Sequence, residues 1–168
     1  MKYIWLLVLF AMTGCMSTKR NKEMKIEKEI HFSVSQERVW EVLTNPEQTR
    51  KYMFGCELIS EWKVGAPMLW KGKTNTGEVI VYVKGNILEL EQGKKVTFSM
   101  FDPNMNLEDI PANYLIMTYE VIAKGKGTIL RLRQENFRNN ETGKKRYEES
   151  LKGWEAIIPD LKQIAEQE

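Results

Sequence analysis

The C-terminal segment from Tyr147 to Glu168 carries the most regular pattern in the chain. Its apolar residues recur at alternating spacings of four and three, at Tyr147, Leu151, Trp154, Ile158, Leu161 and Ala165. This spacing places them on one face of a long helix. Pro159 removes one backbone hydrogen bond inside that helix and is expected to bend it near Ile158. An amphipathic helix of this kind needs an apolar surface to cover, which the rest of the chain has to provide.

Short alternating segments supply that surface. The segment Met24–Val34 alternates apolar and polar residues, as a half-buried strand does. Six further strands are predicted, at Glu57–Trp62, Met68–Lys73, Glu78–Leu90, Lys95–Phe101, Asn113–Ala123 and Thr128–Phe137. Gly85 interrupts the longest of them and predicts a bulge or a sharp bend. The loop from Asp102 to Pro111 is the longest irregular stretch and a candidate lid.

Two short helices are predicted between the first two strands. Ser35 can cap the first helix, although Arg38 stands where a capping box would place Glu or Gln. Asn45-Pro46 ends this helix and starts the second. The order is one strand, two short helices, about six antiparallel strands and one long helix. We therefore expect an α+β fold, in which a curved antiparallel sheet of six to seven strands wraps around the terminal helix.

The N-terminal residues have the features of an export signal. Met1-Lys2 precedes an apolar run from Ile4 to Met12, which is far shorter than the about 20 residues that span a bilayer. The sequence Ala11-Met12-Thr13-Gly14-Cys15 resembles the bacterial lipobox, where the signal peptide is cleaved before a cysteine that carries a diacylglyceryl group. We expect a signal peptide over 1–14, a lipidated Cys15 with a tether over 15–24, and one domain over 25–168.

These features predict where the protein resides. The lipid would anchor it to the bacterial cell envelope, on the periplasmic side or at the outer membrane. The alternative is an ordinary signal peptide with an incidental cysteine at Cys15. If Cys15 is lipidated, Cys56 is the only remaining thiol, and we expect it to be a small buried hydrophobe rather than a reactive group.

Charge gives little support to a nucleic-acid partner. Charged residues make up 29% of the 168 residues, but the net charge is only +2. The basic residues are spread among expected turns, such as Lys94-Lys95 and Lys144-Lys145-Arg146, where solvation explains them. We expect one ordinary domain that is a monomer and does not bind nucleic acid.

Three segments form a recognisable series along the chain. Val39–Glu47 is an apolar-faced helix ending in Asn45-Pro46, Gly85–Leu90 and Lys95–Met100 form a strand pair, and Gly127–Leu132 precedes Gly153-Trp154. Together they resemble the SRPBCC superfamily, also called START-like or birch-pollen-allergen-like. Within it, they resemble the bacterial branch that is similar to the activator of the heat-shock-protein-ninety ATPase. The resemblance covers nearly everything from Lys25 onward and implies a helix-grip fold with a cavity between sheet and helix.

The candidate site follows from strand parity and from the helix stripe. Two rows of apolar side chains are expected to face the terminal helix. One contains Val79, Val81 and Val83, and the other contains Phe98 and Met100. Gln134 falls on an inward row, where a buried amide must pair with backbone, water or ligand. The predicted ligand-binding residues are Met68, Trp70, Val81, Phe98, Met100, Met117, Tyr119, Gln134, Trp154 and Ile158.

Catalysis has little support in the sequence. His31 is the sole histidine and shares a polar strand face with Glu27 and Glu29, which predicts a surface residue. No catalytic triad order, metal-ligand spacing or phosphate-binding loop is found, so we expect neither a metal nor a cofactor. The favoured interpretation is a noncatalytic binder of a small apolar molecule. A polyketide cyclase-like or hydrolase enzyme and a chaperone-activator-like partner module remain as alternatives.

Overall fold

The structure is a computed structural model that describes residues 23–167. Its elements, in chain order, are β1 Ile26–Phe32, α1 Gln36–Thr44, α2 Pro46–Tyr52, β2 Glu57–Ser60, β3 Pro67–Lys73, β4 Val79–Glu91, β5 Lys95–Met100, the short 3₁₀ helix η1 Pro111–Asn113, β6 Leu115–Lys124, β7 Gly127–Glu135 and α3 Glu141–Glu166. The predicted order is confirmed. The export signal, Cys15 and most of the tether lie outside the described residues.

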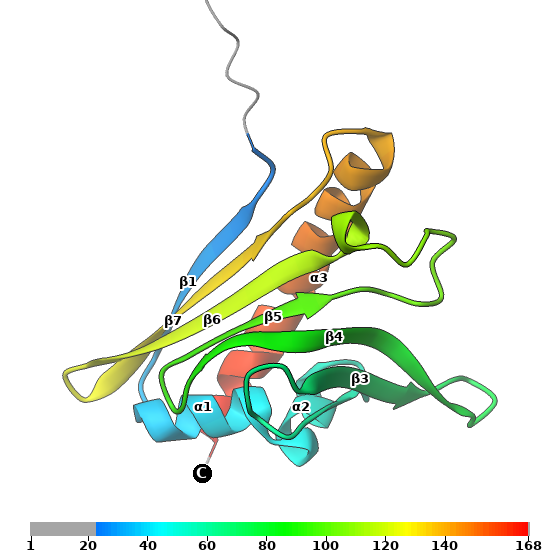
Figure 1. Ribbon diagram of the computed structural model, residues 1–168. Helices are drawn as coiled ribbons and strands as arrows, with labels where there is room; N and C mark the ends of the chain where they lie inside the picture. The colour runs from blue at the N-terminus through cyan, green and yellow to red at the C-terminus, as the bar shows by residue number, and fades with distance from the viewer. Residues whose placement is uncertain (1–22, 168) are drawn as a thin grey trace, which may run out of the picture.

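The strands form one antiparallel sheet in the order β1-β7-β6-β5-β4-β3-β2. The first strand pairs with the last, so Ile30 lies opposite Leu130. Figure 1 shows α3 running along one face of this curved sheet, with α1 and α2 near its C-terminal end. The predicted α+β helix-grip architecture is therefore confirmed. In the described part of the chain no helix is both long and apolar enough to cross a bilayer.

The apolar stripe of α3 packs against the core as expected. Trp154, Ile157, Leu161 and Ala165 are buried, while Tyr147, Leu151 and Ile158 are half-buried and pack against the same cluster. Pro159 lies within α3 on its exposed side. Burying one large apolar side chain stabilises the fold by roughly 1.5–3 kcal/mol, so this face supplies much of what holds the helix on the sheet.

Helix α3 begins six residues before Tyr147, where the apolar stripe starts. The side chain of Asn140 accepts a hydrogen bond from the backbone N–H of Gly143 at 2.8 Å, which caps the first turn. Gly143 is buried, and a Cβ there would come 2.6 Å from the carbonyl carbon of Arg138. A capping residue and a close backbone contact thus define this end of the helix, and neither contributes to hydrophobic periodicity.

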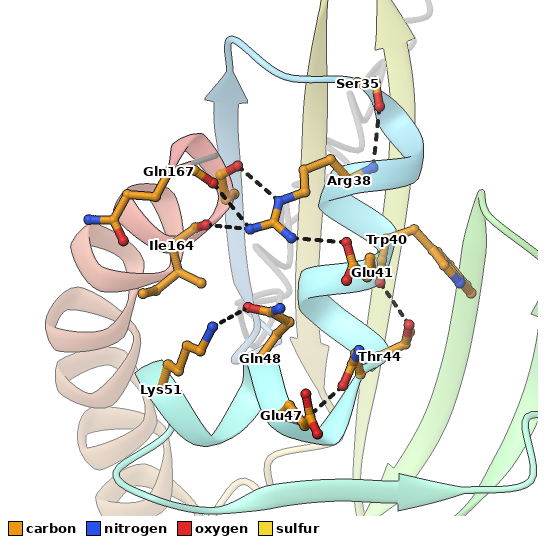
Figure 2. Close-up of polar contacts among 12 residues, drawn as sticks. Ser35, Arg38, Trp40, Glu41, Thr44, Glu47, Gln48, Lys51, Ile164 and Gln167 are labelled. Carbon is orange, nitrogen blue, oxygen red and sulfur yellow. Dashed lines mark hydrogen bonds and ion pairs between the residues drawn. The ribbon is translucent and has the colours of Figure 1, made fainter.

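The C-terminal end of α3 is held by Arg38 of α1 (Figure 2). Its guanidinium donates to the carbonyl oxygens of Ile164 at 2.9 Å and of Ala165 and Gln167 at 3.3 Å. It also forms an ion pair with Glu41 at 2.9 Å. The last carbonyls of a helix have no partners within the helix and carry partial negative charge, so a cation suits this place. Arg38 departs from the capping-box pattern because it caps a different helix.

Strand β4 bends by irregular pairing on both sides of Gly85. The pairing register shifts at Tyr82 against β3 and at Leu88 against β5, so the bulges lie near Gly85 but not at it. At Gly85 itself the backbones of β4 and β5 come very close, since an added Cβ would overlap the carbonyl oxygen of Ser99. Instead of the one bulge predicted at Gly85, β4 has two, each three residues away from it. Gly85 itself allows the backbones of β4 and β5 to approach closely.

The valine row of β4 does not face α3 along its whole length. Val79 is 60% exposed and Val81 and Val83 are half-buried, whereas Ile87 beyond the glycine is buried. The expectation that Val79 points toward the helix is wrong. Because β4 extends past the end of the core, its first residues have no apolar layer above them.

Candidate functional site

A hollow lies between α3 and the middle strands of the sheet. Its volume is about 140 Å³. Strands β4, β5 and β6 contribute Val83, Met100 and Leu115 to its wall, and the loop after β5 contributes Met105. The polar part of the wall consists of Asp102, Gln134, Arg146, Glu149 and Ser150. A cavity of about 150 Å³ accommodates a benzene ring, so the hollow is large enough for one small apolar group.

Gln134 connects the sheet to α3 at the floor of this hollow. It is 3% exposed. Its side-chain oxygen accepts a hydrogen bond from Nε1 of Trp154 at 2.9 Å, and its Nε2 donates to Oγ of Ser150 at 3.3 Å. The inward position predicted for Gln134 is confirmed, and the amide is paired with side chains of the terminal helix. This pairing removes the cost of burying it.

The predicted site residues fall into two groups. Met100 and Gln134 line the hollow. Val81 and Ile158 are half-buried, and the remaining six are buried in the closed core: Met68, Trp70, Phe98, Met117, Tyr119 and Trp154. Most of the predicted residues thus belong to one apolar cluster. Only Met100 and Gln134 of the predicted set line an open hollow beside that cluster. A direct ligand contact for the other eight stays a prediction.

Aromatic rings fill the centre of the space that strand parity assigns to a cavity. Tyr119 makes edge contacts with Phe98 at a centroid distance of 5.5 Å and with Trp154 at 6.3 Å. Burial raises the pKa of Tyr119 well above its usual value, so its hydroxyl stays protonated at neutral pH. An acid–base role for this phenol would need a much lower pKa.

Arg146 is the most buried of the four polar wall residues that are absent from the predicted site, the others being Asp102, Glu149 and Ser150. It is only 8% exposed, and its Nη1 donates to the carbonyl oxygen of Asn113 at 2.9 Å. Burial lowers the pKa of its guanidinium, while Asp102 raises it. From the sequence alone, Arg146 is expected to be solvated like its neighbours Lys144 and Lys145. Counting back from Trp154 in steps of four, through Ser150, places Arg146 on the face of α3 that contacts the sheet.

The loop after β5 closes one side of the hollow. Asp102 and Met105 belong to its wall. Nδ2 of Asn104 donates to the carbonyl oxygen of Val81 at 2.9 Å, and Asp109 forms an ion pair with Lys84. The loop therefore covers the site and is fastened to β4 at two points. Opening of this loop as a lid stays a prediction.

Other chemically interesting side chains lie away from the hollow. His31 is exposed and pairs with Glu29 at 3.2 Å, which confirms its predicted surface position. Cys56 is half-buried, and burial raises the pKa of its thiol, which disfavours the reactive thiolate. Within residues 23–167 no three His, Cys, Asp or Glu side chains are grouped as metal ligands. A groove on the outer sheet face is lined by paired charges such as Glu29, Glu120 and Arg131.

Solved structures share this fold. A protein from Cytophaga hutchinsonii with a known solution structure is 30% identical, with a TM-score of 0.67, over 84% of this chain and 92% of that one. A Mesorhizobium loti protein is 21% identical, with a TM-score of 0.64, over 83% and 95%. An HSP90 activator from Plasmodium falciparum is 20% identical, with a TM-score of 0.63, over 84% and 95%.

A comparison with curated proteins found no match. The sequence from residue 33 to residue 166 matches a family described as "Activator of Hsp90 ATPase homolog 1-like protein". This range includes α1, the strands from β2 onward and α3. The chain therefore belongs to the Activator of Hsp90 ATPase homolog 1-like family, whose helix-grip structure it has.

Proposed function

We propose that this protein is a noncatalytic binding protein for a small apolar molecule, held at the bacterial cell envelope by a lipid on Cys15. The hollow between the sheet and α3 carries the binding part of this proposal. Two flexible methionines, Met100 and Met105, form its wall together with Leu115 and Val83. Methionine side chains adapt to ligands of irregular shape, and small-molecule sites are concave and mostly apolar with few polar groups.

The polar groups around the hollow favour binding over catalysis. Gln134 is occupied by Trp154 and Ser150, and Oδ1 of Asp102 accepts two hydrogen bonds from Asn104, at 2.8 and 3.0 Å. A general base needs a free acceptor within reach of the substrate proton. Gln134 and Oδ1 of Asp102 are therefore engaged in holding the wall of the hollow.

Filling the hollow tests the binding proposal. We expect Met100→Trp to weaken binding of toluene by at least about tenfold, because the larger ring occupies the space of the ligand. Saturation-transfer NMR on the purified protein measures this binding. Leu88→Trp is the matched control, since Leu88 is 43% exposed on β4 and lies away from the hollow, and it should leave binding unchanged. Toluene binding that is absent in the parent protein, or equal in both variants, contradicts the proposal.

The membrane part of the proposal rests on the lipobox-like segment at Ala11–Cys15. Two or three acyl chains hold a protein firmly, because each buried methylene contributes about 0.8 kcal/mol. A tether over residues 15–24 reaches at most about 35 Å, so the domain would stay close to the membrane.

A cysteine exchange tests the anchor. In the native cells, we expect the parent protein in the membrane fraction and the Cys15→Ser variant in the soluble fraction, measured by immunoblot after ultracentrifugation. Cys56→Ser is the control and should fractionate like the parent, because this half-buried thiol lies in the folded domain. A Cys15→Ser variant that still sediments with membranes would refute the lipid anchor and leave the binding proposal intact.

A further inference from the structure

Arg146 is a buried cation with an incomplete set of partners. It is 8% exposed, and its single hydrogen bond within residues 23–167 runs from Nη1 to Asn113. Its neighbours Lys144 and Lys145 pair with glutamates on the next turn of α3, at 4.0 and 3.8 Å, whereas no carboxylate oxygen in the described chain lies within 4 Å of the Arg146 guanidinium. Buried charges in proteins are normally paired, so this one requires an explanation.

Two nitrogens of the Arg146 guanidinium are accessible to solvent. In residues 23–167, every side-chain nitrogen or oxygen that is shielded from solvent has a hydrogen-bond partner. Nε and Nη2 of Arg146 have no such partner there, so they must reach solvent. Arg146 lines both the hollow beneath α3 and an adjoining one of about 400 Å³ beside Met105. These two nitrogens present parallel N–H donors, the arrangement that binds both oxygens of one carboxylate.

Charges around Arg146 do not occupy this fork. Asp102 lies near enough to raise the pKa of Arg146 but forms no ion pair with it within 4 Å, and its Oδ1 accepts from Asn104; Glu149 pairs with Lys145. The side chains of Glu149 and Lys145 are 59% and 76% exposed, so water and salt screen both charges. The buried guanidinium is therefore the group whose charge a ligand in the hollow would meet with the least screening.

We propose that the ligand of this site is a small amphipathic monocarboxylate, with its carboxylate on Nε and Nη2 of Arg146 and its apolar part against Met100, Met105 and Leu115. This inference rests on the proposed binding function and names its ligand class. The size of the hollow, about 140 Å³, sets the apolar part at about one ring or a short branched chain. The adjoining hollow leaves room for the remainder of the molecule.

The test compares phenylacetate with phenylacetamide, which match in shape and differ in charge. We expect the parent protein to bind phenylacetate at least about tenfold more tightly, as measured by NMR titration at neutral pH. Arg146→Gln should abolish this preference, because it weakens phenylacetate binding far more than phenylacetamide binding. Lys144→Gln removes a positive charge from an exposed position of the same helix turn that lines neither hollow, and should retain the preference.

Arg146→Lys covers the case in which Arg146→Gln fails to fold. A lysine keeps the charge but not the paired donors, so we expect a reduced preference for the acid. Equal binding of acid and amide by the parent protein would overturn the carboxylate inference and leave the apolar site standing. An unchanged preference in Arg146→Lys and Arg146→Gln would overturn the role of Arg146. Failure of both compounds and of toluene to bind would overturn the proposed function as well.

Discussion

Replacing Trp154 by alanine is expected to lower the free energy of unfolding by about 4 kcal/mol. Trp154 is 7% exposed and joins α3 to the sheet. Its ring lies edge-on to Tyr119, and its Nε1 donates to Gln134 at 2.9 Å. Truncation would leave a cavity beneath the helix and an amide oxygen without its partner. Urea unfolding followed by circular dichroism measures the change.

A double-mutant cycle separates the hydrogen bond from the ring. Trp154→Phe keeps an aromatic ring but removes the N–H donor, and Gln134→Leu removes the acceptor. Each single change leaves a buried polar group unpaired, so we expect each to lower the free energy of unfolding by about 2 kcal/mol. The double variant removes both partners and should cost clearly less than the two single losses together. Additive losses would contradict the view that Gln134 and Trp154 act as one connection between β7 and α3.

Replacing Gly85 by alanine is expected to cost about 3 kcal/mol or more. An added Cβ would overlap the carbonyl oxygen of Ser99 and come 2.5 Å from its carbonyl carbon. The clash is with backbone, so relief requires β5 to move away from β4. That movement would disturb the 3.0 Å hydrogen bond from the N–H of Asn86 to Oγ of Ser99.

The matched control for this substitution is Gly153→Ala. Gly153 lies inside α3, and a Cβ there would meet nothing within 4 Å. Alanine stabilises a helix interior by roughly 0.5–1 kcal/mol relative to glycine, so this variant should become more stable. Thermal unfolding of both variants gives the comparison. Similar stability of the two alanine variants would show that β4 and β5 tolerate separation at Gly85.

Sequence patterns predict most of the fold because two periodicities carry it. Alternation within the strands and the four-and-three spacing from Tyr147 to Ala165 each identify a buried face, and the capping residues Ser35 and Asn45 mark helix starts. The early start of α3 at Glu141 could not be found in this way. Its first turn is fixed by the cap Asn140 and by the close packing of Gly143 against Arg138, which are local contacts that leave no trace in the hydrophobic spacing.

The candidate site is less predictable than the fold. Alternation tells which side chains point inward, but it does not tell how completely they fill the interior. Large rings such as Trp70, Phe98 and Tyr119 occupy the space where the sequence suggests a cavity, and the open volume lies to one side, at Met100 and Gln134. Arg146 follows two lysines in the sequence, so its burial becomes visible only when α3 is placed on the sheet.

The most direct test of the binding site uses its own methionines as reporters. Met100 and Met105 line the hollow, whereas Met53 is half-buried after α2, away from it. A titration with toluene, followed through the carbon-13-labelled methionine methyl signals, should shift the Met100 and Met105 signals to saturation and leave that of Met53 in place. Unchanged Met100 and Met105 signals at saturating toluene would contradict an apolar binding site between the sheet and α3.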